Sequence, residues 1–225
     1  MLRKWFCLQL IIFFGFQGVV IADSKTESVL QKLREECKQL LFETYKHENS
    51  FVRAAVLRAA GDSHDPDLIN LLKKGIEDYY PTARLFALQG LKEVSKPVAL
   101  EAARKLTDDH DIWVRSAAIE ILGDHGGSEV IEEIRGHLKS YDVPVKLAAS
   151  AGLVKLGKSS YLEGVLNPLT HPIPNRRYQA IGYLGKIGKK EVLPHLVKLF
   201  DHPEPEMIFY SLKALEGKAT PDMLP

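Results

Sequence analysis

Histidines are the side chains whose spacing could most readily support metal chemistry. His47, His171 and His202 are separated by multiples of 31 residues, so they occupy one column of a repeat. Equivalent positions in stacked helical repeats lie roughly 10 Å apart, whereas a zinc ion needs three or four ligands within about 2 Å. We therefore interpret these histidines as polar turn residues and predict no metal site.

Basic side chains form a second column with the same spacing. They could be an anion-binding row, but one cation per repeat at the start of a helix can also pair with acids of neighbouring turns, such as Asp78, Asp109, Asp111 or Asp142. We favour this second interpretation, a structural ladder. Its members are Arg53, Arg84, Arg115, Lys146 and Arg177.

No motif in the chain specifies an enzyme active site. The sequence contains no Gly-rich phosphate loop, no HExxH and no Gly-x-Ser-x-Gly, so we predict no catalytic residue and no cofactor. Only two cysteines occur, which excludes a disulfide scaffold. Cys37 shares its column with Leu68, Ala99 and Val130, and we expect it to be a small buried hydrophobe.

The overall composition is that of a foldable globular chain. Of the 225 residues, 45% are apolar and 26% charged, and 30 basic against 29 acidic residues give a formal net charge of +1. Because no basic excess exists, nucleic acid is not expected as a partner.

Residues 1–22 differ in kind from the rest of the chain. Two basic residues precede an apolar run, and Val20-Ile21-Ala22 supplies small or branched residues before a cleavage point at Asp23. The 18 residues from Trp5 to Ala22 are short for a membrane span. We expect a cleaved secretory signal, export to the periplasm or the medium, and no membrane contact after cleavage. An uncleaved N-terminal anchor is the alternative.

The remaining chain, residues 23–225, repeats every 31 residues without a linker. Apolar residues recur at i, i+3 and i+7, the pattern of a helix with one buried stripe. In one copy the first helix is marked by Ile131, Ile134 and Leu138, and the second by Val114, Ala118 and Leu122. Such hairpins are too short to be stable alone. We predict one domain, an all-α, right-handed α-solenoid of about six repeats.

Helix-end signals follow the same period. The column suited to N-cap the second helix contains Asn49, Asp111 and Asp142. The next column, suited to the first helical turn, contains Pro81, Pro174 and Pro205. The column suited to end the helix contains Gly126, Gly157 and Gly188.

Two segments carry a family resemblance. Residues 114–123 (VRSAAIEILG) and 177–188 (RYQAIGYLGKIG) resemble the short HEAT-like repeat named after phycobilisome bilin lyases. Deoxyhypusine hydroxylases also look like HEAT-type arrays, which implies His-Glu pairs in several repeats that hold two irons. Here the only such dipeptide is His47-Glu48, with Asp78-Tyr79 and Asp109-His110 as its equivalents, so that ligand set is absent. The resemblance implies a fold that serves scaffolds and enzymes alike.

The side of the second helices opposite the apolar stripe is where we expect a partner. Its charged column changes sign along the chain and reads Asp62, Glu93, Asp124, Lys155 and Lys186. Ala148, Ala151 and Gly182 would leave a shallow floor, with Phe86 and Tyr178 as aromatic anchors. The alternative is a solvated face whose small residues only let helices pack.

The last predicted helix departs from the pattern. Ile208 replaces the ladder cation, and Phe209 and Tyr210 follow it before Leu212, which we assign to the core. Because a terminal repeat should present a polar outer face, Phe209 and Tyr210 predict docking of a partner or of a second copy. Coverage by the tail 216–225 is the alternative.

These features predict an exported, non-catalytic scaffold or assembly factor. We expect it to bind an unidentified protein through the concave face, the C-terminal edge or both, with self-association through the last repeat. One alternative is an enzyme or cofactor-handling protein, lyase-like or metal-dependent, built on the repeat. The other is a membrane-tethered structural protein.

Overall fold

The computed structural model describes residues 24–216, and all regular structure in that range is helical. The array predicted as one domain divides into two compact units, Met1–Leu106 and Thr107–Pro225. The signal segment 1–22 and the tail after Glu216 lie outside the described residues. Within the described range, no helix combines the length and hydrophobicity needed to cross a bilayer.

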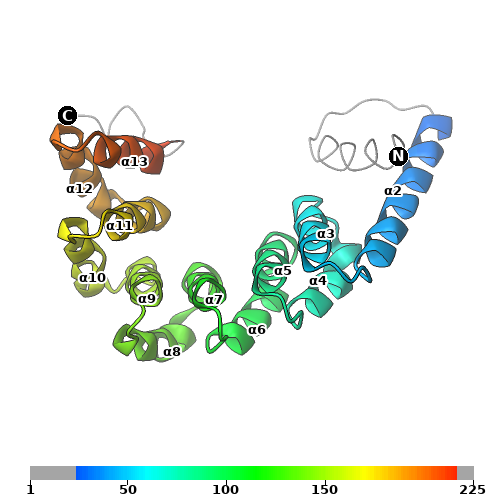
Figure 1. The fold of residues 1–225 in the computed structure, drawn as a ribbon, viewed down its shortest axis with the longest axis horizontal. Coiled ribbons are helices and arrows are strands. Elements are labelled where there is room, and N and C mark those ends of the chain that lie inside the picture. Colours follow the sequence, from blue (N-terminus) through cyan, green and yellow to red (C-terminus); the bar gives the residue numbers. More distant parts are fainter. Residues whose placement is uncertain (1–23, 217–225) are drawn as a thin grey trace. The chain divides into compact units, whose positions relative to one another are not determined.

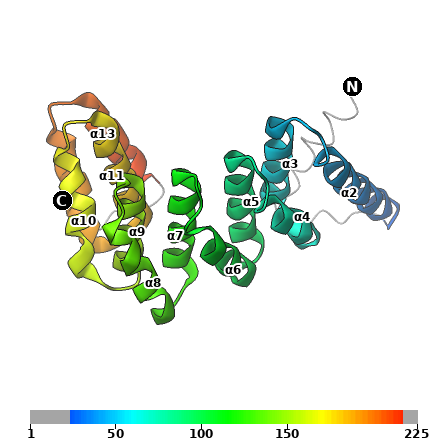
Figure 2. The same cartoon turned by 60° about the horizontal axis from the view of Figure 1, so that its bottom comes forward.

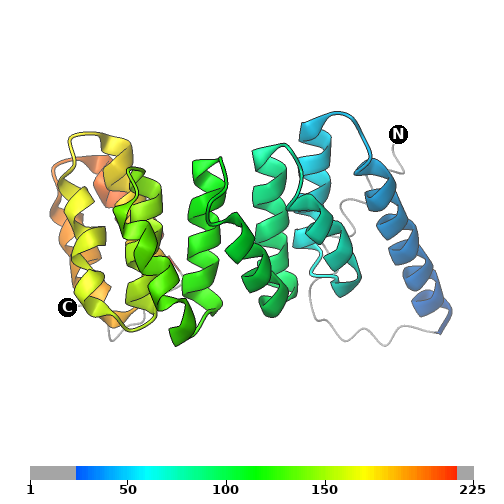
Figure 3. The ribbon, with the colours of Figure 1, turned by 90° about the horizontal axis from the view of Figure 1, so that it is seen from below.

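The first unit consists of one long helix followed by shorter helices that pack in pairs. Its helices are α2 (Ser24–Thr44), α3 (Ser50–Asp62), α4 (Ile69–Gly75), α5 (Pro81–Val94) and α6 (Lys96–Leu106). The second helices α3 and α5 lie side by side (Figure 2), and α4 and α6 lie in front of them when the unit is seen from below (Figure 3).

The second unit repeats this two-row arrangement. Its helices are α7 (Ile112–His125), α8 (Ile131–Gly136), α9 (Val143–Lys155), α10 (Glu163–Leu166), α11 (Pro174–Ile187), α12 (Leu193–Val197) and α13 (Pro205–Leu215). α7, α9, α11 and α13 form one row, and α8, α10 and α12 form the other (Figure 1). Helices therefore occur where the 31-residue columns place them, and the predicted all-α solenoid is confirmed.

The first helices of most hairpins are short because 3₁₀ turns flank them. Pro66–Leu68 precedes α4 as a 3₁₀ turn, and Asn167–Thr170 follows α10 as another. Pro168 lies inside that second turn; it lacks the N–H that an α-helix would need there. The longer second helices consequently dominate the packing.

Most of the predicted helix ends are observed. Pro81, Pro174 and Pro205 begin α5, α11 and α13, and Gly188 ends α11 with a left-handed φ of 62°. The side chain of Asp111 caps α7, whereas Asp142 occupies the predicted N-cap position of α9 without a side-chain cap hydrogen bond. Pro144, the second residue of α9, has no N–H to donate to that carboxylate, which accepts from Arg115 instead.

Glycines permit the second helices to approach closely. A Cβ built on Gly61 would lie 2.6 Å from Cα of Gly90, and one on Gly123 would lie 2.5 Å from Cα of Gly152. These pairs bring α3 to α5 and α7 to α9 at backbone contact. The leucines of the predicted stripe in four of the repeats, Leu91, Leu122, Leu153 and Leu184, are fully buried.

Candidate functional site

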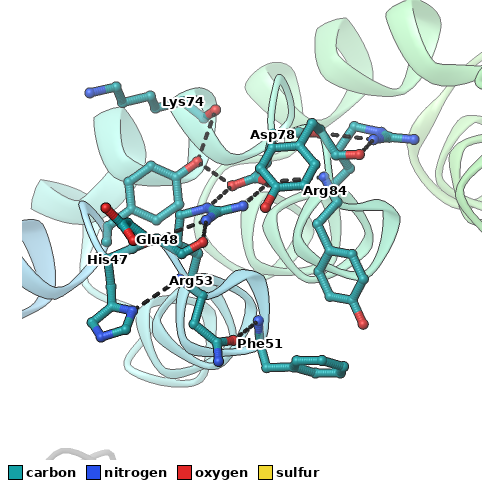
Figure 4. A network of polar contacts seen from close by, with 11 residues as sticks. His47, Glu48, Phe51, Arg53, Lys74, Asp78 and Arg84 are labelled. Atoms are coloured by element: carbon teal, nitrogen blue, oxygen red, sulfur yellow. Dashed lines mark hydrogen bonds and ion pairs between the residues drawn. The ribbon is translucent and has the colours of Figure 1, made fainter.

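A polar network fills the turn between α4 and α5 (Figure 4). Arg53 of α3 donates from Nε to Oδ2 of Asp78 at 2.7 Å and from Nη2 to Oδ1 at 2.9 Å. Its Nη1 donates to the carbonyls of His47 and Glu48, at 3.0 and 2.8 Å. Both Arg53 and Asp78 are buried, so this guanidinium ties the turn before α3 to the turn after α4.

Asp78 has two further donors, the hydroxyl of Tyr45 at 3.1 Å and the N–H of Tyr80 at 2.9 Å. Burial alone would raise the pKa of the Asp78 carboxyl, but the hydrogen bonds from Arg53, Tyr80 and Tyr45 hold that pKa below its usual value. Burial and the Asp78 charge raise the pKa of Tyr45 to about 12. This network is saturated and leaves no acceptor for a ligand.

The other three arginines of the ladder column also bind groups of the turns, either of their own repeat or of the next one. Arg84 donates to the carbonyls of Asp78 and Tyr79 at 2.8 and 3.0 Å. Arg115 donates to Asp142 at 2.6 Å, and Arg177 to Glu204. Lys146 is exposed and forms no ion pair within residues 26–216. Asp142 therefore serves as an arginine acceptor rather than as a helix cap.

The histidine column has a shared local geometry. Nδ1 of His47, His171 and His202 accepts the N–H two residues later, at 3.0, 3.0 and 3.1 Å. Carboxylates or a hydroxyl make the same contact at the equivalent positions Asp78, Asp109 and Ser140. These histidines thus stabilise turns. In the described part of the chain, no three His, Cys, Asp or Glu side chains are grouped to hold a metal ion.

We define the inner face as the surface of the second helices that points away from the first helices. In the second unit the charged residues of the predicted column form ion pairs. Lys155 of α9 pairs with Asp124 of α7, and the two side chains are 19% and 16% exposed. Lys186 of α11 reaches Glu120 of α7 at 2.7 Å and also lies 4.8 Å from the centre of the Tyr183 ring.

The floor that was expected over α9 is not exposed. Ala148 and Ala151 are buried, so the prediction of a shallow open floor there is wrong. Burial and the neighbouring Glu120 raise the pKa of Tyr183, which keeps its hydroxyl protonated. Only Gly182 remains exposed, with nothing within 4 Å of a Cβ built on it.

The first unit's part of the column is exposed and loosely paired. Arg58 lies 3.8 Å from Asp62 and its guanidinium carbon is 5.7 Å from the centre of the Phe86 ring. Glu93 lies 3.9 Å from His64. Phe86 is half-buried beneath Arg58, so it presents little free aromatic surface.

The inner face of α11 and α13 carries a stacked aromatic pair. The rings of Tyr178 and Tyr210 lie 4.5 Å apart at an angle of 24°, and both side chains are half-buried. Phe209 meets Tyr210 edge-on and is 60% exposed, as predicted for the outer side. Leu212 is 53% exposed, so its assignment to the core is wrong. No described helix follows α13 to cover that position.

Several residues of the inner face and of the helix starts were not proposed as site residues from the sequence. Glu120 and Tyr183 belong to the inner-face cluster, and their signal was present, because Glu120 precedes Lys186 by two repeats and one helical turn. Large apolar side chains also project from the turns before the second helices and from the first residues of these helices. These exposed residues are Phe51, Tyr79, Trp113, Tyr141 and Ile173.

Comparisons with known proteins agree on the architecture. A family model described as HEAT repeats matches residues 71–153 and 137–216. The fold is similar to that in the complex of CpcE and CpcF of phycocyanin lyase from Nostoc sp. PCC7120, with a TM-score of 0.67, 22% identity, and coverage of 96% of this chain and 90% of that chain. An archaeal HEAT-like repeats protein from Thermococcus onnurineus NA1 matches with a TM-score of 0.45 and 15% identity over 95% of each chain. No match was found among curated proteins.

Proposed function

Since the chain belongs to the HEAT repeat family, we propose that it is an exported, non-catalytic scaffold or assembly factor that binds another protein. Stacked helical repeats form extended surfaces suited to protein partners. The CpcE and CpcF chains of phycocyanin lyase, which share this fold, form a complex with each other. That neighbour supports protein binding without identifying a partner for this chain.

One observation carries the proposal, the Tyr178–Tyr210 stack beside exposed Gly182 on the inner face of α11 and α13. Aromatic side chains that are partly buried and held in place are common binding hot spots, because they lose little conformational entropy on binding. Across α7, α9 and α11 the charges of this face pair with each other. The aromatic pair is therefore the part of the inner face that is free to contact a partner.

Site-specific cross-linking tests this binding surface. A photo-crosslinking residue at Gln179, which follows Tyr178 in α11, should capture a defined protein in the native compartment. The same residue at Tyr141, fully exposed on a turn, is the matched control and should not capture it. Tyr178→Ala with Tyr210→Ala should abolish the Gln179 product. Equal cross-linking from both positions, or none from Gln179, would contradict the proposed surface.

Export is supported by the basic and apolar segment 1–22 alone. Mass spectrometry of the N-terminus in the native host tests it, with a mature chain that starts at Asp23 as the expected result. Retention of residues 1–22 together with fractionation into membranes would instead favour the membrane-tethered structural protein.

The second candidate is an enzyme or cofactor-handling protein built on the repeat. It is favoured by the fold shared with phycocyanin lyase chains and by the inner-face cluster of Glu120, Tyr183 and Lys186. Against it, the raised pKa of Tyr183 makes that hydroxyl a poor base at neutral pH. Metal analysis of purified protein separates the candidates, because stoichiometric iron or zinc would overturn the scaffold role.

A further inference from the structure

The outer side of α13 presents a seam of exposed residues. Pro205, Phe209 and Leu212 follow one another at intervals of four and three residues, which places them along one line of the helix, and Glu216 follows directly after its end. All four are exposed. At the positions equivalent to Leu212, the other second helices carry Leu57, Leu88, Ile119, Ser150 and Ile181, all buried. In α13 the residue at this position, Leu212, is instead 53% exposed.

Two opposite charges flank this seam on one side only. Glu206 and Lys213 are seven residues apart, so they lie one above the other on the helix, beside Phe209 and Leu212. Both are exposed, and neither forms an ion pair within the described residues. On the other side of the seam, half-buried Ile208 leads into the unit's own core residues Ser211 and Leu215.

We propose that this seam binds a second copy of the chain, with the two α13 helices antiparallel about a two-fold axis. In that arrangement Phe209 lies opposite the partner subunit's Leu212, and the axis repeats the contact. Glu206 then comes within side-chain reach of the partner subunit's Lys213, again twice. The seam is thus complementary to itself in both shape and charge.

The charges select the antiparallel orientation. In an antiparallel pair of helices the same flanks of the two helices meet, so the flank with Glu206 and Lys213 faces its own copy. In a parallel pair this flank would face the opposite one, where Ile208 already packs against its own unit. Only the antiparallel dimer therefore pairs all four charges.

The dimer should be weak and concentration-dependent. α13 has 11 residues, and one helix face of that length covers less than the roughly 800 Å² per partner of a standard interface. We expect a dissociation constant of about 1–100 µM. This inference goes beyond the proposed function, because it assigns a second copy of the chain to the outer side of α13.

Charge exchange tests the dimer by sedimentation equilibrium. Glu206→Lys and Lys213→Glu should each raise the dissociation constant at least 10-fold, because each places two like-charged pairs in the interface. An equimolar mixture of the two variants should dimerise again, as every pair in the heterodimer is then attractive. The double variant should also recover. Glu163→Lys, an exposed change on α10, is the matched control and should dimerise like the original chain.

Several outcomes would overturn the proposal. A chain that is monomeric at several hundred micromolar has no such interface. If deletion of residues 217–225 turns that monomer into a dimer, the chain's own tail occupies the seam instead. Single variants that dimerise as tightly as the original chain would place any dimer contact elsewhere. Circular dichroism melts of each variant separate these results from unfolding, because both charges are exposed.

Discussion

Removal of Arg53 should destabilise the protein far more than removal of its counterparts in other repeats. Arg53→Ala deletes two hydrogen bonds to Asp78 and leaves that carboxylate 7% exposed with only two neutral donors, Tyr45 and Tyr80. Breaking a buried ion pair on one side typically costs about 3–5 kcal/mol. We therefore expect a loss of this size in the free energy of unfolding.

The same column supplies graded controls. In the Arg115–Asp142 pair the side chains are 21% and 42% exposed, so Arg115→Ala should cost about 1 kcal/mol or less. Lys146→Ala, which removes an exposed cation without an ion pair in the described range, should change stability by no more than about 0.5 kcal/mol. Urea denaturation of each variant measures the series. Hydrogen exchange in α3 and α4, with α11 as the internal reference, assigns the loss to the first unit.

A double substitution distinguishes the burial argument from a general dependence on Arg53. Arg53→Met with Asp78→Leu removes both charges and should recover most of the loss, because hydrophobic replacements of buried pairs are often neutral or stabilising. The pH dependence offers a second check. Since the folded state holds the pKa of Asp78 below its ordinary value of about 3.9, its contribution is present above that pH and is lost as the pH falls below it. An Arg53→Ala variant as stable as Arg115→Ala would refute this reasoning.

Three other predictions concern the core, the helix contacts and alkaline pH. Leu122→Ala, in the fully buried stripe, should cost about 2–5 kcal/mol, while Leu212→Ala on the exposed seam should stay within about 0.5 kcal/mol in the same denaturation assay. Gly123→Ala should cost about 1–3 kcal/mol, since the added Cβ must displace the backbone at Gly152, and Gly182→Ala, where space is free, is the control by thermal melting. The pKa of Tyr45 is raised to about 12, so its contribution is complete below the ordinary value of about 10 and is lost as the pH rises through 12; an alkaline titration of stability should show this loss, and Tyr45→Phe should remove it.

The helical architecture was predictable because its causes are periodic. A buried stripe every 31 residues, together with prolines at positions such as Pro81 and Pro174, marks the second helices. Departures arose where one local residue changed the outcome. Asp142 has the right type and position for a cap, but Pro144 removes one of the possible donors, and the carboxylate accepts from Arg115 instead.

The candidate site was less predictable, because it depends on contacts between repeats. Burial of Leu212 requires a following helix, which the periodic pattern of one column does not show. The close backbone contact between Gly61 and Gly90 likewise joins two different columns, because Gly90 lies two positions before the repeat equivalent of Gly61. Comparison of residues 31 positions apart does not show such pairs. Comparison of residues 29 positions apart, as Gly61 and Gly90 are, would show them.

The inner-face charges illustrate this point and direct the search for a partner. A column that changes sign from Asp124 to Lys155 suggests a dipolar partner if each charge is assumed to face solvent. Adjacent repeats, however, place these two side chains together, and Lys186 is directed to Glu120. Reversal of both lysines to glutamate should therefore weaken the second unit itself, and a loss of binding in that variant would not locate the partner. The stacked pair of Tyr178 and Tyr210 takes no part in these ion pairs, so substitutions there leave the charges of the inner face in place.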